Sequence, residues 1–189
     1  RGYHEASMDG IASAAGFTKR TVYQYFATKE DLYFAVMAAI FEGLGEALAA
    51  ATRDQAPGLD RLWAGFSCFQ AFYRDDPRRM RLFSYVSQLG GSGVPHYAVW
   101  RQASDSLIGT IAALIAAGKA DGSLRPELDP ARTAHSVVFL TTAFFSLLAV
   151  SGESFSRSSG IDAEDFSRST MGLLVEARAS RGEGGRGPR

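Results

Sequence analysis

The chain has 189 residues, of which 46% are apolar and 21% charged, the composition of a globular protein with one large domain or two small ones. Twenty basic side chains balance twenty acidic ones, which excludes a uniformly basic, histone-like nucleic-acid binder but leaves room for a local basic patch. Cys68 is the single cysteine, so a disulfide framework, a cysteine zinc cluster and a CxxC redox pair are excluded. We therefore expect a protein of the reducing cytoplasm.

Two segments bear on targeting and membranes. Residues 1–10 are polar and lack the apolar core of a signal peptide. Residues 133–152 carry no charge and approach the length of a membrane-spanning helix, but polar side chains interrupt them and no basic cluster flanks them. We expect a helix that the protein itself buries on nearly all sides, and no membrane association.

Apolar residues recur at helical spacing in almost every segment, and no run alternates as a half-buried strand does. The sequence therefore predicts an all-α fold. Capping residues divide its first part into three helices. These cover residues 8–15 (N-cap Ser7, stop at Gly16), 19–26 (N-cap Thr18) and 29–51 (N-cap Thr28).

Proline and glycine separate the remaining helices. Pro57-Gly58 breaks the chain, Asp76-Pro77 and Asp129-Pro130 each start a helix, and residues 90–93 form a glycine-rich link. The expected segments are helices over 59–73, 77–89, 95–120 and 130–150, a polar loop over 151–160, a last amphipathic helix over 161–179, and a disordered Gly- and Arg-rich tail over 181–189.

Residues 7–31 carry the functional signal. Two short helices joined by the turn Gly16-Phe17-Thr18 form a helix-turn-helix, whose second helix can enter the major groove of DNA. A small apolar seam fixes the angle between them: Ile11, Ala12, Val22 and Phe26.

The outward side chains of the second helix suit DNA. Lys19 and Arg20 can reach phosphates or guanine edges, and Gln24 can pair with adenine N6 and N7. Lys29 can hold a backbone phosphate beside the positive end of the third helix. Four hydroxyls can bind phosphate oxygens, which positions a protein without specifying sequence: Thr18, Thr21, Tyr23 and Tyr25. A generic hairpin with a solvated polar face is the alternative, and two tyrosines in one exposed turn argue against it.

These residues resemble a known family. The strings GYHEASMDGIA (2–12), AGFTKRTVYQYF (15–26) and TKEDL (28–32) are similar to the DNA-binding domain of TetR-family transcriptional regulators. The resemblance implies a homodimeric, ligand-responsive regulator, usually a repressor. It also implies a family helix before Gly2-Tyr3, which is absent from this chain. The residues that it places at the DNA surface are Ser7, Thr18, Lys19, Thr21, Tyr23, Gln24 and Lys29.

The rest of the chain is rich in large aromatic residues, and a helical bundle of this kind can enclose an apolar cavity for a small molecule. Plain core packing is the alternative for each aromatic. His135 could orient a polar group of the ligand or be a core or interface histidine. The candidate ligand-binding residues are Trp63, Phe66, Phe69, Phe83, Trp100, Leu107, Ile111, His135 and Phe139.

Motifs for catalysis and metal binding are missing from the sequence. It contains no GxSxG, HExxH or Walker loop, and no histidine has a second ligand at helical spacing. We therefore expect no enzyme activity, no metal and no cofactor.

The last two helices have the apolar content to form a homodimer as a four-helix bundle across a two-fold axis. The candidate residues are Val137, Leu140, Phe144, Leu147 and Leu148 on one helix, and Phe166, Met171, Leu174 and Val175 on the other. A dimer can read a palindrome because its two recognition helices are held about 34–36 Å apart.

The sequence thus predicts a DNA-binding domain over 1–31, a ligand-binding and dimerisation domain over 32–180, and the tail. The expected function is a repressor that binds a palindromic operator and is released by a small, largely apolar effector. The helix that starts at Lys29 would couple the two sites, with Gly43 and Gly45 as bend points. A dimeric small-molecule-binding or scaffold protein without DNA binding, and a small helical enzyme, are the alternatives.

Overall fold

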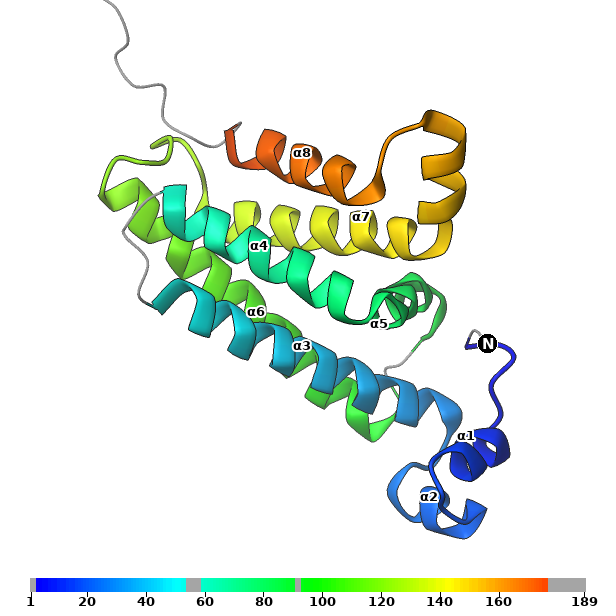
Figure 1. The fold of residues 1–189 in the computed structure, drawn as a ribbon. Helices are drawn as coiled ribbons and strands as arrows, with labels where there is room; N and C mark the ends of the chain where they lie inside the picture. The colour runs from blue at the N-terminus through cyan, green and yellow to red at the C-terminus, as the bar shows by residue number, and fades with distance from the viewer. Residues whose placement is uncertain (1–2, 54–58, 91–92, 177–189) are drawn as a thin grey trace, which may run out of the picture.

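The computed structural model describes residues 3–53, 59–90 and 93–176, and every regular element within these ranges is a helix, which confirms the all-α fold. Figure 1 shows α1 and α2 as a small head at one end of α3, with the other helices stacked into a body. In chain order the elements are α1 (Met8–Ala14), α2 (Lys19–Tyr25), α3 (Lys29–Arg53), α4 (Leu59–Asp75), α5 (Pro77–Arg81), a 3₁₀ helix η1 (Leu82–Gln88), α6 (Pro95–Ala120), α7 (Pro130–Ser159) and α8 (Ala163–Glu176).

Local capping explains where the head helices begin and end. The Ser7 hydroxyl accepts a hydrogen bond from the Gly10 N–H, and the Thr18 hydroxyl accepts one from the Thr21 N–H, each at 3.1 Å. Gly16 has a φ of 73°, the left-handed conformation that stops α1. These caps were predicted, and the structure confirms them.

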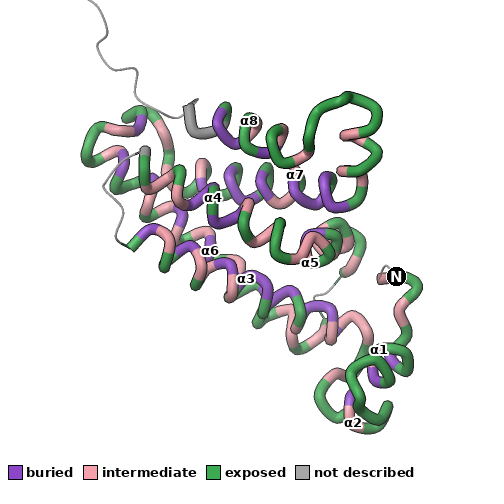
Figure 2. Tube along the Cα trace, viewed as in Figure 1, coloured by how far each residue is buried: buried purple, intermediate pink, exposed green. Residues whose placement is uncertain are grey.

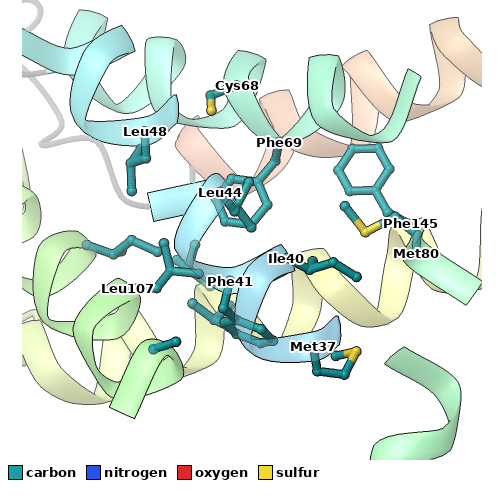
Figure 3. Packing of buried hydrophobic residues seen from close by; sticks show 14 of the residues in the cluster. Met37, Ile40, Phe41, Leu44, Leu48, Cys68, Phe69, Met80, Leu107 and Phe145 are labelled. Carbon is teal, nitrogen blue, oxygen red and sulfur yellow. The ribbon is translucent and has the colours of Figure 1, made fainter. Parts of the chain in front are cut away.

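Helix α3 is the axis of the body. Phe34, Met37 and Leu44 on this helix are completely buried. Figure 3 shows side chains of α3 packed against Phe69 of α4 and Leu107 of α6, with Phe145 of α7 beside Met80 of α5. Because α3 runs without a break across residues 31 and 32, the same helix belongs to the head and to the body.

The head has its own small core, formed by Met8, Ala12 and Val22, with Phe26 and Leu32 packed against it. The rest of α1 and α2 is largely exposed (Figure 2). Few apolar contacts therefore hold the head together.

Three expectations about the body were wrong. The segment after Asp76-Pro77 is a short α-helix followed by the 3₁₀ helix η1, instead of one α-helix to residue 89. The loop expected over 151–160 is the last part of α7, which Gly160 closes at a φ of 70°. The last helix begins at Ala163 instead of residue 161, since Asp162 accepts hydrogen bonds from the backbone of Glu164 and Asp165.

One aromatic contact explains the longer α7, whose serines bond within the helix. The hydroxyls of Ser151 and Ser159 donate to the carbonyls of Leu147 and Phe155, four residues back, each at 2.8 Å. Phe155 also packs on Phe166 of α8, with ring centroids 4.6 Å apart. The serine content favoured a loop in the sequence, but the tertiary contact keeps the segment helical.

Helix α7 is also less buried than expected. Phe139, Leu147 and Val150 are 72%, 65% and 65% exposed, so one side of this helix is open and apolar. Both α3 and α7 are long and apolar enough to cross a membrane by length and composition alone. In the structure, both pack against other helices of the body.

Some predictions fall outside the described residues. They are the break at Pro57-Gly58, part of the glycine-rich link, the end of the last helix beyond residue 176, and the tail over 181–189.

Candidate functional site

Helix α2 presents a polar face at the tip of the head. Lys19, Arg20, Tyr23, Gln24 and Tyr25 are all exposed, while Val22 between them is buried in the head core. Tyr25 is 70% exposed, which is unusual for so large an aromatic side chain. The structure therefore brings together on one surface most of the side chains that the sequence assigned to DNA.

The amino-terminal turn of α2 gathers the two threonines. Thr18 and Thr21 place their hydroxyl oxygens 2.8 Å apart, at the end of the helix where unpaired backbone N–H groups favour an anion. Ser7, which caps α1, is exposed. Phe17, in the turn between the helices, is 60% exposed and was not among the expected site residues.

The cations of the head differ in their partners. Lys19 pairs with Asp9 of α1 at 2.9 Å, and this hydrogen bond raises the pKa of the Lys19 ammonium. Arg20 is exposed and forms no ion pair with the described part of the chain. A DNA phosphate must compete with Asp9 for the Lys19 ammonium, whereas the Arg20 guanidinium is available to bind a phosphate or a base edge.

Lys29 points inward, which the sequence did not indicate. Its ammonium donates to the carbonyls of Tyr3 and Ala6, each at 3.0 Å, and lies 4.4 Å from the centroid of the Tyr3 ring. The lysine thereby fastens the segment before α1 onto the start of α3. Any contact with phosphate would be made from this fastened position.

Asp31 joins the head to α6. Its carboxylate is almost fully buried and accepts hydrogen bonds from the Ala27 N–H at 3.2 Å and the His96 N–H at 3.0 Å. The His96 ring nitrogen Nδ1 also lies 3.0 Å from the carboxylate. Burial raises the pKa of Asp31, but the hydrogen bonds from His96 and Ala27 outweigh it and hold the pKa below the usual value.

A cavity of the body lies between α3, η1, α6 and α7 and has a volume of about 630 Å³, within the range of small-molecule sites. Four of the expected ligand residues line it: Phe83, Trp100, His135 and Phe139. Ten further residues complete the wall: Phe41, Ser84, Val86, Ile108, Val138, Thr142, Ala143, Ser146, Leu147 and Val150.

Five expected ligand residues lie elsewhere. Phe66, Phe69 and Ile111 surround a void of only about 30 Å³, and Leu107 is fully packed in the core. Trp63 lies at the outer surface between α4 and α8, against Gly172. The α7 residues of the wall, from His135 to Val150, recur at spacings of three and four, and this helical spacing was a usable signal in the sequence. Phe66 and Phe69 of α4, by contrast, belong to the core.

The residues covered by the structure give no support for metal chemistry, because they contain no group of three or more His, Cys, Asp or Glu side chains that could hold an ion. The buried Cys68 is no better placed as a nucleophile, since burial raises the pKa of its thiol.

A helix-turn-helix head joined by one continuous helix to an all-α body with a lateral cavity is the build of a transcriptional regulator with a separate ligand-binding domain. Residues 1–36 match the family model of bacterial regulatory proteins of the tetR family. The HTH-type transcriptional activator FasR of Mycolicibacterium smegmatis (strain ATCC 700084 / mc(2)155) is 38% identical over 91 residues, which is 47% of this chain. The match spans 42% of that relative's length.

Solved structures share the whole fold at low identity. The ketosteroid transcriptional regulator KstR2 of Mycobacterium tuberculosis has a TM-score of 0.69 at 16% identity, covering 96% of this chain and 88% of its own. The regulator FadR of Bacillus subtilis, solved in complex with stearoyl-CoA, has a TM-score of 0.69 at 19% identity, covering 92% and 89%. Together with the match of the head, these findings make the chain similar to TetR-family transcriptional regulators.

Proposed function

We propose that the chain acts as a cytoplasmic homodimer that binds a palindromic DNA operator and represses transcription until a small, largely apolar effector reduces its affinity for DNA. The observation that carries this proposal is the exposed polar face of α2, in which cationic, amide and hydroxyl groups surround a buried Val22. Arg20 and Gln24 would contact base edges, and Tyr23 and Tyr25 would contact phosphates.

The cavity in the body supports an apolar effector. Its wall combines aromatic and aliphatic side chains with a few hydroxyls and one imidazole. A long acyl group fits this lining, and stearoyl-CoA is the molecule bound to the FadR regulator of the same fold. We infer that the effector carries an extended alkyl chain.

Helix α3 is the proposed coupler between the two sites. It carries Lys29 and Asp31 at the head and Phe41 in the cavity wall, about 18 Å further along the helix axis at 1.5 Å per residue. A ligand that displaces Phe41 would tilt the head of each subunit. The tilt changes the spacing of the two α2 helices, and operator affinity falls because the altered spacing no longer fits two successive major grooves.

The 3₁₀ helix η1 offers a second contact between cavity and head. Residues three apart lie on one side of such a helix, so Phe83 and Val86 share the cavity side while Leu82 and Tyr85 share another. The Tyr33 hydroxyl donates to the Leu82 carbonyl at 2.7 Å. The Tyr85 ring lies 5.6 Å from the ring of Tyr3, in the segment before α1.

The proposed dimer uses the open side of the last two helices. Val137, Leu148 and Met171, which were expected at the interface, are instead buried in the core of the single chain. The exposed apolar residues available for a partner are Phe139, Leu140, Leu147 and Val150 on α7 and Leu173 on α8. The side chains of Leu174 and Val175, also expected there, lie outside the described residues.

A gel-shift assay on fragments of the source genome tests the proposal. The protein should retard specific fragments. Its affinity for them should fall as the salt concentration rises, because contacts with phosphates release counterions from the DNA. Addition of a long-chain acyl-CoA should release the fragments. Absent or salt-insensitive retardation contradicts DNA binding. If the fragments are retarded but no acyl compound releases them, the proposed effector is contradicted and DNA binding is not.

Activation is the second candidate for the direction of regulation, because FasR is named a transcriptional activator. A reporter gene placed behind a bound fragment decides between the two. Deleting the regulator should raise expression if it represses, and lower expression if it activates.

A further inference from the structure

One ion pair joins α1 and α2 on the outside of the head. The Lys19 ammonium, at the first residue of α2, lies 2.9 and 3.0 Å from the two carboxylate oxygens of Asp9 on α1. The ammonium is also 5.8 Å from the centroid of the Tyr23 ring, one helical turn further along α2. Lys19 is therefore held from two sides, although its side chain is 59% exposed.

The pair contributes little to the structure of the head. Met8, next to Asp9, and Val22, three residues after Lys19, are buried in the small core of the head, so the backbone on both sides of the pair is already fixed. An ion pair between two exposed side chains adds little to stability, because water screens it. Its consequence is electrostatic, since it changes the charge that the polar face of α2 presents to DNA.

As a unit, Asp9 and Lys19 carry no net charge. Non-specific affinity for DNA comes mainly from cations that neutralise phosphates, and a phosphate that approaches Lys19 meets the Asp9 carboxylate beside it. The acceptors of a base edge carry no formal charge, so the carboxylate repels them far less. An ammonium has three N–H donors, and the Asp9 carboxylate occupies only one side of it, so Lys19 keeps a donor for a base.

We propose that Asp9 is a positioning residue that directs Lys19 toward a guanine edge instead of a phosphate, and so raises the sequence specificity of DNA binding. The inference rests on the proposed DNA binding by α2 and assigns Lys19, for which the sequence indicated either partner. The remaining N–H of Lys19 would donate to O6 or N7 of one guanine in each half-site. Without Asp9, the ammonium would bind a phosphate of any sequence in place of the guanine.

Asp9→Asn tests the proposal, because it keeps the size of the side chain and removes its charge. Selection from a random DNA library gives the base preferences, and anisotropy titrations at several salt concentrations give the affinities for the selected operator and for a random duplex. The variant should lose the preference for guanine at one position in each half-site and bind the random duplex roughly threefold to tenfold more tightly at low salt. On the random duplex, the slope of log affinity against log salt should steepen by about 0.9 per subunit, because each Lys19 gains a phosphate. The ratio of operator affinity to random affinity should fall.

Glu5→Gln is the matched control for charge. Glu5 is exposed in the segment before α1 and forms no ion pair within the described residues, so its replacement removes one negative charge from the head without releasing a lysine. It should leave both the guanine preference and the salt slope as in wild type. Asp9→Glu keeps the carboxylate beside Lys19 and should retain both properties as well.

Lys19→Met shows whether Asp9 acts through Lys19. It should remove the preference for the same guanine, and combined with Asp9→Asn it should cancel the steeper salt slope. A guanine preference or a salt slope that Asp9→Asn leaves unchanged overturns the proposal, and so does an equal effect of Glu5→Gln. Failure of the wild-type protein to enrich any operator contradicts the proposed DNA binding itself, which separates that result from a failure of Asp9 alone.

Discussion

At the scale of single residues, Asp31 shows how the head is attached to the body. Its carboxylate receives the N–H groups of Ala27 and His96 from two different helix ends, while its own backbone N–H is bonded to the Thr28 hydroxyl. A buried carboxylate in such a position is stable only when its hydrogen bonds are satisfied. Asp31 therefore fastens the start of α6 to the start of α3.

Asp31→Asn should destabilise the protein by about 1–3 kcal/mol, because an amide cannot accept all the hydrogen bonds that the carboxylate accepts. Since these bonds lower the pKa of Asp31 in the folded state, its contribution is present above the ordinary aspartate pKa and is lost as pH falls below about 4. Urea denaturation across this pH range measures both effects. The difference between wild type and variant should shrink in acid.

Asp105→Asn is the matched control, because Asp105 is exposed and pairs with Arg101 on the same helix at 3.6 Å. It should change stability by less than about 0.5 kcal/mol. Equal losses of unfolding free energy in the two variants would show that the buried hydrogen bonds of Asp31 stabilise the protein no more than the exposed ion pair of Asp105.

At the scale of elements, α3 is proposed to couple the effector cavity to the DNA-binding head. Substitutions at its interior glycines, Gly43 and Gly45, test whether the helix bends there. A methyl group added at Gly43 or Gly45 meets no atom within 4 Å, so alanine fits at both positions. Each substitution should stabilise the helix by about 1 kcal/mol and stiffen it. The double variant should bind operator normally and need more effector for release.

Gly109→Ala on α6 is the control for this prediction, because a methyl group there also meets no atom within 4 Å. It should leave the release curve unchanged. The measurement is fluorescence anisotropy of labelled operator during effector titration. Unchanged release in the double variant would remove bending at these glycines from the mechanism.

The sequence predicted those elements whose limits are local. Caps and prolines lie next to the helix ends that they fix, so Thr18, Asp76 and Asp129 could be identified without a structure. The longer α7 depends on Phe155 meeting Phe166, and η1 depends on its packing against α3 and α7. Such tertiary contacts leave no local signal in the sequence.

The same distinction holds for the candidate sites. The polar face of α2 is continuous in sequence, so Lys19 to Tyr25 could be assigned to one surface. The cavity draws on four elements, and aromatic content does not distinguish Phe83 in its wall from Phe69 in the core. The inward Lys29 depends on the carbonyls of Tyr3 and Ala6, which only the folded chain brings near.

At the scale of the whole molecule, the dimer determines whether two heads can reach one operator. Leu140 on α7 and Leu173 on α8 are exposed and lie outside the effector cavity, so they can be changed without altering the ligand wall. Leu140→Glu with Leu173→Glu should raise the dimer dissociation constant at least about thirtyfold, which corresponds to about 2 kcal/mol. Analytical ultracentrifugation measures it.

Val99→Glu is the matched control, since Val99 is equally apolar and exposed but lies on α6. It should leave the protein dimeric. If the double variant also stays dimeric, the two subunits meet through another surface.

The central claim is that the exposed face of α2 reads base pairs in a dimer. Selection of bound fragments from a random DNA library, followed by sequencing, tests it most directly. Wild type should enrich palindromes whose half-sites are about 34–36 Å apart, Gln24→Ala should relax one position in each half-site, and Arg20→Ala should weaken binding at both half-sites. No enrichment, or enrichment that is unchanged by Gln24→Ala and Arg20→Ala, would contradict the account.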